Sequence, residues 1–308
     1  MQIISIGEVL WDVFEEKEFL GGAPLNFSAH AEKLGDNATL VTAVGLDVRG
    51  ERARNGMRTL GLNAEFVQAV RDVPTGAAII QTDTEGNASF VIARPAAFDC
   101  ITADDVLLER VYELGPDWIY FGTLAMTNEK TETALQHILQ RVPKVHRFYD
   151  MNLRTGHWNL ELVKRLSGLA TVLKLNDIEA EQLAQLTFPQ IVFDLERFCR
   201  YWVKEYGIET ICVTLGGDGC AVLHHGAFER FPGYHIQVAD TVGAGDAFAA
   251  AFLHHLHVGL PMDQTAQFAN ALGALVASKN GATPHWDAEE YRQLMAQQSM
   301  MPNSGQAH

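Results

Sequence analysis

The run 240–248, DTVGAGDAF, places two carboxylates and two glycines at the start of a segment rich in helix formers. Gly243 and Gly245 can take backbone conformations closed to other residues, so successive N–H groups can point into one concavity. The dipole of the helix that follows favours an anion there. Because a carboxylate would repel a resting anion, Asp246 suits another task, which is to accept a proton from a hydroxyl that attacks a bound phosphate. The run predicts phosphoryl transfer, with Asp246 as the base and the amides of Gly243, Ala244 and Gly245 around the transferred group.

A second glycine turn, GGAPLN at 21–26, also leads into a predicted helix. Its paired glycines would let a ligand come close to the backbone, and Asn26 could point its side-chain amide at that ligand. Both runs also have a structural interpretation. An Asp before a helix often only caps it, and paired glycines often only make a tight turn.

Polar residues follow two further predicted strands. Asn176 and Glu179 stand at a helix start, where they could share one face or form an ordinary cap. Arg154 follows another strand, where it could reach sugar or phosphate oxygens or pair with Asp150. Ligands of α/β sheets bind beyond the carboxyl ends of the strands, so both groups are candidate site residues.

These segments together resemble the signatures of the PfkB/ribokinase-like carbohydrate kinases, in the right order and spacing across residues 6–284. The run 240–248 is similar to the C-terminal signature of that family, and 21–26 is similar to the N-terminal one. The resemblance implies a ribokinase-like fold and ATP-dependent phosphorylation of a sugar hydroxyl. The forms of 21–26 and of DMNLR at 150–154 are most similar to bacterial fructokinases. Ribokinase, 2-keto-3-deoxygluconate kinase and a non-catalytic sugar sensor stay open as alternatives.

The same resemblance implies a role for single residues. The sugar would contact Asp12, Gly21, Gly22, Asn26 and Arg154. The nucleotide would contact Asn176, Thr214, Gly216, Gly219 and Asn270. Glu179 would order Mg²⁺ through water, and Asp240 and Gly281 would lie beside a monovalent cation such as K⁺. The expected small molecules are therefore a sugar and ATP, with Mg²⁺ as the cofactor.

Apolar strand-like runs alternate with helical runs over most of the chain, which predicts βαβ units. The predicted strands are 3–6, 39–44, 118–121, 145–150, 172–175 and 210–215. The predicted helices are 25–34, 49–60, 128–142, 178–186, 194–206, 247–257 and 263–279. The fold class is therefore α/β, with a mostly parallel central sheet and helices on both faces.

One stretch breaks the alternation of strands and helices. Two β-like runs, 75–83 and 88–93, flank a turn signal, TEGN, with no helix between them. This insertion predicts a small β lid over the sugar site, to which 10–20 could add another strand. The predicted division is 1–10, 21–74 and 99–308 for the kinase core and 11–20 and 75–98 for the lid. An edge of the lid could pair with the lid of a second subunit in a homodimer.

The chain is acidic, with a formal net charge of −15 over 308 residues and no run rich in Lys and Arg. Surfaces that bind nucleic acid or anionic membranes need basic patches, so neither partner is expected. No apolar stretch approaches the length of a membrane span. The opening run 1–7 lacks the basic start of a signal peptide, and we therefore expect a cytoplasmic protein.

Several common motifs are missing from the sequence. The four cysteines are widely spaced with no C-x-x-C pair, so we expect reduced thiols. The histidines at 224–225 and 254–257 have no carboxylates at metal-ligand spacing. A P-loop is missing, and no G-x-G-x-x-G follows the first strand, so neither a Walker-type ATPase nor a dinucleotide-dependent dehydrogenase is indicated.

Overall fold

A nine-stranded sheet forms the centre of the molecule in the computed structural model, which describes residues 1–14, 17–82 and 88–299. Its order is β13-β12-β11-β10-β9-β8-β1-β4-β5. The strands are β1 (Gln2–Ile6), β4 (Asn37–Gly45), β5 (Val67–Val70), β8 (Trp118–Gly122), β9 (His146–Asp150), β10 (Val172–Asn176), β11 (Thr210–Thr214), β12 (Cys220–His224) and β13 (Ala227–Phe231). The strands from β5 to β11 in this order are parallel. Of these strands, only β12 runs the opposite way, because it pairs antiparallel with both β11 and β13. The predicted mostly parallel sheet is confirmed.

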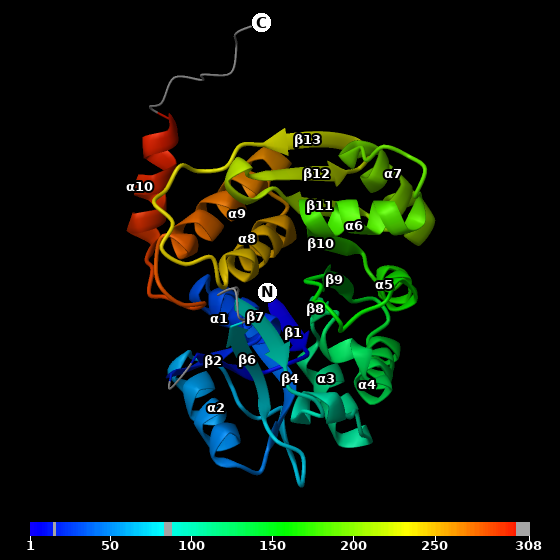
Figure 1. Ribbon diagram of the computed structural model, residues 1–308, viewed down its shortest axis with the longest axis vertical. Helices are drawn as coiled ribbons and strands as arrows, with labels where there is room; N and C mark the ends of the chain where they lie inside the picture. The colour runs from blue at the N-terminus through cyan, green and yellow to red at the C-terminus, as the bar shows by residue number, and fades with distance from the viewer. Residues whose placement is uncertain (15–16, 83–87, 300–308) are drawn as a thin grey trace, which may run out of the picture.

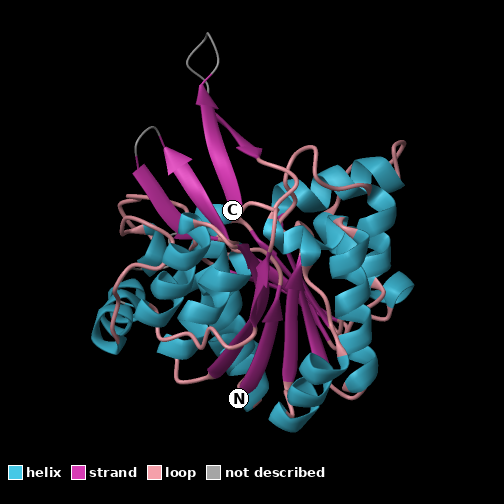
Figure 2. Cartoon of the chain, turned by 90° about the horizontal axis from the view of Figure 1, so that it is seen from below, coloured by secondary structure: helices cyan, strands magenta, loops and turns pink. Residues whose placement is uncertain are grey.

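Helices cover both faces of this sheet (Figure 2). They are α1 (Ala23–Lys33), α2 (Val48–Thr59), α3 (Asp105–Leu114), α4 (Glu129–Arg141), α5 (Leu160–Ser167), α6 (Asp177–Thr187), α7 (Leu195–Tyr206), α8 (Ala244–Val258), α9 (Met262–Ala277) and α10 (Ala288–Ser299). Each predicted helix and strand of the core is present, with ends that differ by a few residues. The sequence did not single out β5, β12, β13, α3, α5 or α10.

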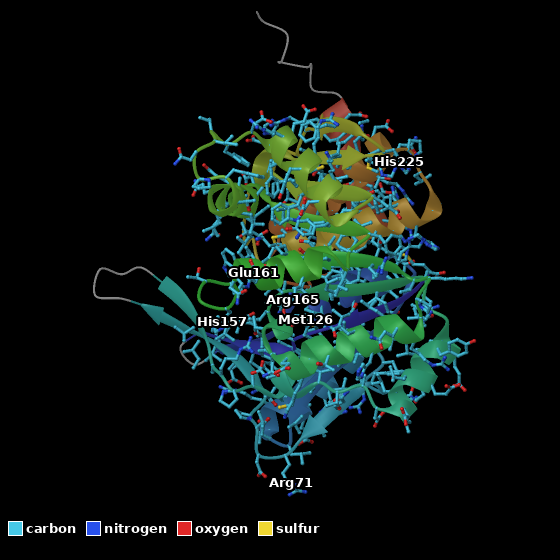
Figure 3. The ribbon with its side chains drawn as sticks, turned by 90° about the vertical axis from the view of Figure 1, so that its right-hand side faces the viewer. Arg71, Met126, His157, Glu161, Arg165 and His225 are labelled. Carbon is cyan, nitrogen blue, oxygen red and sulfur yellow. The ribbon has the colours of Figure 1, made fainter. Side chains whose placement is uncertain are left out.

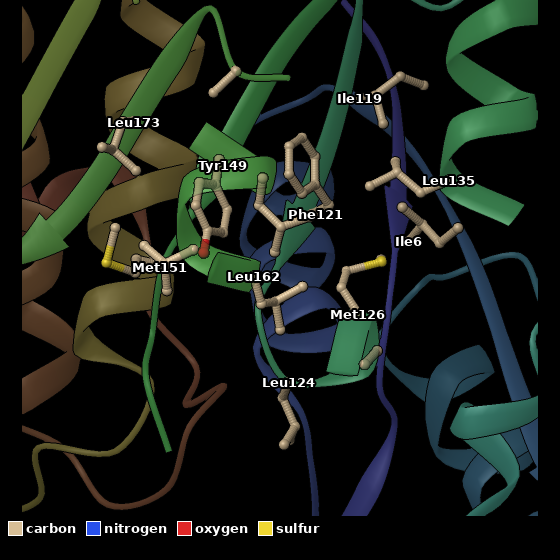
Figure 4. Close-up of a cluster of buried hydrophobic side chains, with 14 of the residues drawn as sticks. Ile6, Ile119, Phe121, Leu124, Met126, Leu135, Tyr149, Met151, Leu162 and Leu173 are labelled. Atoms are coloured by element: carbon tan, nitrogen blue, oxygen red, sulfur yellow. The ribbon is translucent and has the colours of Figure 1, made fainter. Parts of the chain in front are cut away.

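Alternate residues of the buried strands contribute to hydrophobic clusters on opposite faces of the sheet, because successive side chains of a strand point to opposite faces. A further cluster packs residues of α1 and α2 against β4. Ile3 lies with residues of α1, α8 and α9 on one face of the sheet. Ile4 and Ile6 lie on the other face, with residues of α3 to α7. Figure 4 shows part of the cluster on this face, in which Phe121 and Tyr149 stack with ring centroids 5.2 Å apart. The sheet is held from both sides, which fixes the ends of its strands.

A second sheet of four strands, in the order β3-β2-β6-β7, stands at the end of the central strands away from the N-terminus (Figure 2). Figure 1 labels its strands β2, β6 and β7. Its strands are β2 (Leu10–Phe14), β3 (Lys17–Gly21), β6 (Gly76–Thr82) and β7 (Ala88–Ile92). The predicted hairpin is present as the antiparallel pair of β6 and β7, and its turn at 84–87 lies outside the described residues. The segment 10–20 supplies two strands where one was expected. The predicted lid boundaries and the predicted pairing of two lids stay predictions.

Helix α1 is joined to the loop 281–284 by side chains from its second half. His30, which is fully buried, accepts a hydrogen bond at Nδ1 from Trp286 Nε1 at 3.1 Å. Because the indole can only donate, the ring proton of His30 sits on Nε2, which lies 3.0 Å from the carbonyl oxygen of Ala282 and donates to it. Lys33 donates to the carbonyl oxygens of Thr283 and Pro284. These contacts fix the loop against α1.

The buried His30 predicts a loss of stability in mild acid. Burial lowers the pKa of His30 from its usual 6.5 to about 4, although the bond to Ala282 opposes the shift. Between these values the unfolded chain binds more protons, so the free energy of unfolding falls as the pH falls, by up to about 1.4 kcal/mol per pH unit. The free energy of unfolding, measured with urea at pH 6.5, 5.5 and 4.5, should change less with pH in His30→Gln than in the wild type.

His137→Gln is the matched control, because His137 is exposed and should leave the wild-type slope unchanged. Equal slopes in the wild type and His30→Gln would contradict this account of His30.

Candidate active site

Helices α1 and α8, which both begin after a glycine, are joined by a buried hydrogen bond near their starts. Asp246 lies in the first turn of α8, and Asn26 lies in the first half of α1. Asn26 Nδ2 donates to Asp246 Oδ2 at 2.8 Å, across 220 residues of sequence. Both side chains are buried. The structure thus brings the predicted base and a predicted sugar residue into direct contact.

The start of α8 has the form expected of an anion site. Gly243 is its N-cap residue, with φ +79°, and no side chain of the described residues caps this end. The helix begins at Ala244, three residues before the predicted Ala247, which places Asp246 within the first turn. The N–H of Ala244 donates to the carbonyl of Thr241 at 3.3 Å, so this amide already has a partner within the turn. Uncapped N–H groups at a helix start favour negative charge.

Charged groups surround Asp246 in the interior. Its pKa is raised to about 6, first by burial and then by the carboxylate of Asp150. Lys174, the hydrogen bond from Asn26 and Arg154 act in the opposite direction and lower this pKa. Asp246 is therefore ionised at neutral pH, and its pKa lies close enough to that pH for the carboxylate to take up a proton.

The alternative in which Arg154 pairs with Asp150 is not what the structure shows. Asp150, at the end of β9, lies opposite Lys174 of β10. Lys174 Nζ lies 2.9 Å from Asp150 Oδ1 and 3.2 Å from Oδ2, and Tyr120 Oη donates to Oδ2 at 3.0 Å. Arg154 is exposed in the loop after β9, and its charge lowers the pKa of Asp12 and of Glu8.

The remaining predicted sugar residues lie where the second sheet joins the core. Burial raises the pKa of Asp12, on β2, to about 6, against the effect of Arg154. A Cβ atom on Gly21 would lie 2.7 Å from Asp12 Oδ2. Gly22 caps α1 with φ +117°, and a Cβ atom there would lie 2.4 Å from the carbonyl oxygen of Glu8. Gly22 is therefore required by the backbone, whereas a side chain at Gly21 would displace the carboxylate of Asp12.

Asn176 and Glu179 form a capping box at the start of α6. Asn176 Oδ1 accepts from the N–H of Glu179, and Glu179 Oε2 accepts from the N–H of Asn176, both at 2.8 Å. Glu179 Oε1 also accepts from the N–H of Leu153 at 2.6 Å, and the side chain is buried. Each carboxylate oxygen keeps one free lone pair, which fits a contact with an ion through water.

The predicted nucleotide residues lie along the neighbouring strand ends. Thr214 ends β11, Gly216 begins the next turn with φ +59°, and Gly219 ends it with φ +98°. Asn270 of α9 is buried and donates to the carbonyl oxygens of Phe231 and Pro232 at 3.3 and 3.1 Å. Asn270 therefore holds the chain after β13, and its amide nitrogen is already occupied.

Asp240 and Gly281 are brought together, as expected of the predicted cation site. Asp240 Oδ2 accepts from the N–H of Gly281 at 3.0 Å, and Oδ1 accepts from the N–H of Val242 at 3.0 Å. In the described part of the chain, no three His, Cys, Asp or Glu side chains gather as metal ligands would. A cation at this point would therefore rest mainly on backbone carbonyls.

Sequence reasoning missed two charged residues next to the site. Glu8 follows β1 and is buried, and burial raises its pKa to about 7. Lys174 stands inside the apolar run of β10. A charge within an otherwise apolar strand is a signal that could have found Lys174, since unpaired charges are almost never buried.

A separate cavity of about 320 Å³ lies beside α5 and the short helix 125–127, and its lining includes Arg94, His157 and Arg165. Figure 3 labels His157 and Arg165 on this side of the molecule. Arg94 pairs with Asp99, and Arg165 pairs with Glu132, so both positive charges are already matched. None of the predicted sugar or nucleotide residues lines this cavity.

Comparisons with known proteins show the family of this chain and its fold. A family model described as pfkB family carbohydrate kinase matches residues 4–289. Aminoimidazole riboside kinase of Salmonella typhimurium is 27% identical over 90% of this chain and 89% of the relative. Fructokinase-1 of Zea mays is 27% identical over 93% of this chain and 95% of the relative. The crystal structure of fructokinase with bound ATP from Xylella fastidiosa superposes with a TM-score of 0.84 and 21% identity, covering 96% of this chain and 99% of that one.

Among the helices of the described residues, none combines the length and apolar character needed to cross a bilayer.

The two capping glycines of α8 predict different costs for the same substitution. Gly243 and Gly259 have φ +79° and +77°, so alanine is strained equally at both. At Gly259 a Cβ atom meets nothing within 4 Å, whereas at Gly243 it would lie 2.2 Å from the carbonyl oxygen of Ala282. Gly259→Ala should cost about 1 kcal/mol of unfolding free energy. Gly243→Ala should cost at least about 2 kcal/mol more, because the loop must shift.

Chemical denaturation of both variants would measure the difference. Equal losses of unfolding free energy would show that the loop with Ala282 does not hinder a side chain at Gly243.

Proposed function

The chain belongs to the pfkB family of carbohydrate kinases, and on that basis we propose that it is a fructokinase, which transfers the γ-phosphate of ATP to the primary hydroxyl of fructose. As a member of this family, it is an ATP-dependent sugar kinase. The observation that carries the assignment of the site is the hydrogen bond between Asn26 and Asp246. It joins the sugar side of the site to the group that would accept the proton.

In this proposal Asp246 takes the proton as the hydroxyl oxygen attacks the γ-phosphorus in line. The backbone at Gly243, Ala244 and Gly245 would stabilise the charge that builds on the transferred group. Asp12, Gly21, Gly22, Asn26 and Arg154 would hold the sugar. Among the buried polar atoms of the described residues that have no hydrogen-bond partner are two at this site, Glu8 Oε2 and Asn26 Oδ1, which suits a site completed by hydroxyl donors. The lid would close over the sugar and exclude water as a competing acceptor.

The nucleotide side would use Asn176, Thr214, Gly216, Gly219 and Asn270. Glu179 fits Mg²⁺ only through water, since both of its oxygens already accept backbone N–H groups. When bound with ATP, Mg²⁺ neutralises phosphate charge. The bond between Asp240 and Gly281 supports a monovalent cation site at that loop, with K⁺ as the expected ion.

Fructose is favoured over other acceptors by the forms of 21–26 and 150–154, which look most like those of fructokinases. Relatives at the same 27% identity include a fructokinase and an aminoimidazole riboside kinase, so overall similarity does not choose between them. Ribose and 2-keto-3-deoxygluconate are the other acceptors to test.

The test of the acceptor is ADP release with Mg²⁺-ATP on a panel of fructose, ribose, 2-keto-3-deoxygluconate, tagatose, glucose, adenosine and aminoimidazole riboside. We expect fructose to give the highest kcat/KM. A better acceptor on the panel would replace fructose in the proposal. Tight ATP binding with no ADP formed on any of them would point to the sugar-sensing alternative.

Asp246→Asn should lower kcat by about 10²–10⁴-fold, because a positioned base typically contributes that much. The amide keeps an oxygen that can accept from Asn26, so the fold and the KM values should change little. Asp177→Asn, at an exposed position in the first turn of α6, is the control and should keep the wild-type kcat. Near-normal turnover in Asp246→Asn would remove Asp246 from the role of base.

A further inference from the structure

Lys174 and Asp150 form an ion pair inside the molecule. Their side chains are 9% and 1% exposed, and Lys174 Nζ lies 2.9 and 3.2 Å from the two carboxylate oxygens. The two residues face each other on neighbouring strands, β10 and β9. Tyr120 donates a further hydrogen bond to the carboxylate. Both partners are held in place from three strands of the sheet.

The ammonium group of this pair lies directly against the start of α8. A Cβ atom built on Gly245 would lie 3.2 Å from Lys174 Nζ. Gly245 immediately precedes Asp246, so the ammonium lies beside the turn that carries the predicted base. Stability alone does not explain a lysine at this position, since well-packed apolar residues often stabilise a fold as well as a buried ion pair does.

We propose that Lys174 is a positioning residue for phosphoryl transfer, in which its ammonium keeps Asp246 ionised and in place and Asp150 fixes the ammonium. This inference rests on the proposed role of Asp246 as the base. The chemistry itself is unchanged, because the proton still passes from the sugar hydroxyl to Asp246. Lys174 acts only through the charge that it presents to that carboxylate.

The other groups around Asp246 come from every neighbouring element. Arg154, from the loop after β9, lowers its pKa, as does the hydrogen bond from Asn26 of α1. Glu8 lies beyond β1, and the charge of Asp246 contributes to its raised pKa. Tyr120 of β8 keeps its proton, because burial and then the charge of Asp150 raise its pKa well above the usual value. The two members of the ion pair act on Asp246 with opposite signs, Asp150 raising its pKa and Lys174 lowering it.

These opposite signs make the inference testable with two variants. Asp150→Asn removes the negative member and leaves the ammonium beside Asp246. The acid limb of the profile, where kcat/KM falls as Asp246 is protonated, should then shift by about one unit to lower pH. The rate at pH 5, relative to the plateau, should then rise about fivefold over the wild type. Asp150→Asn with Lys174→Met removes both charges, and the limb should return towards that of the wild type.

A purely structural ion pair would behave differently. Both variants would lose stability, measured as the melting temperature, and both would keep the acid limb of the wild type. Asp36→Asn is the matched control, because Asp36 is also buried and paired, with the N-terminus and His254, but lies before β4 at the other end of the strands. It should lower stability without moving the limb.

A second readout does not depend on turnover. In protein with ¹³C-labelled aspartate carboxyls, the signal lost in Asp246→Asn identifies Asp246, and its titration midpoint should fall in Asp150→Asn and recover in the double variant. Unchanged midpoints in both variants would overturn the inference even if the wild type is an active kinase. A wild type that forms no ADP on the panel, with midpoints that move as described, would overturn the proposed function and leave the role of Lys174 as the charge partner of Asp246.

Discussion

The hydrogen bond from Asn26 to Asp246 is the contact on which the rest of the site depends. It closes a loop of 220 residues and requires the starts of α1 and α8 to meet over the same end of the sheet. A bond to a charged group contributes about 1.5–3 kcal/mol, and losing one partner would leave the other buried without its bond. The strands between these helices, and the hydrophobic clusters that pack on both faces of the sheet, bring the two helix starts together.

The overall fold could be predicted because its signals are local. Alternating apolar strands and amphipathic helices predict a parallel sheet, and caps such as that of Asn176 and Glu179 lie within four residues of sequence. The errors came where local signals are weak. The sequence predicts that α8 starts at Ala247, because glycine is a poor helix former, yet the helix begins at Ala244 and includes Gly245. The antiparallel strands β12 and β13 carry little polar–apolar alternation to separate them from loops.

The site was only partly predictable, since its chemistry depends on contacts across strands. The glycine runs and Asp246 stand out in the sequence, but nothing local says that Lys174 faces Asp150. That pairing follows from the register of β9 and β10, which is set by packing. For the same reason the sequence favoured no partner for Asp150 beyond the nearby Arg154. The pKa of Asp246 also depends on these distant neighbours, so no motif could have given it.

Helix α1 joins the proposed sugar side of the site to the loop 281–284. Asn26 near its start contacts Asp246, while His30 and Lys33 in its second half hold the loop 281–284. A helix of 11 residues is about 16 Å long and has little freedom to stretch. The distance between Asn26 and the loop 281–284 is therefore set by the number of helical residues between them. Surface loops tolerate inserted residues, whereas one residue inserted in α1 would rotate its far end by about 100°. His30 and Lys33 would then no longer face the loop 281–284.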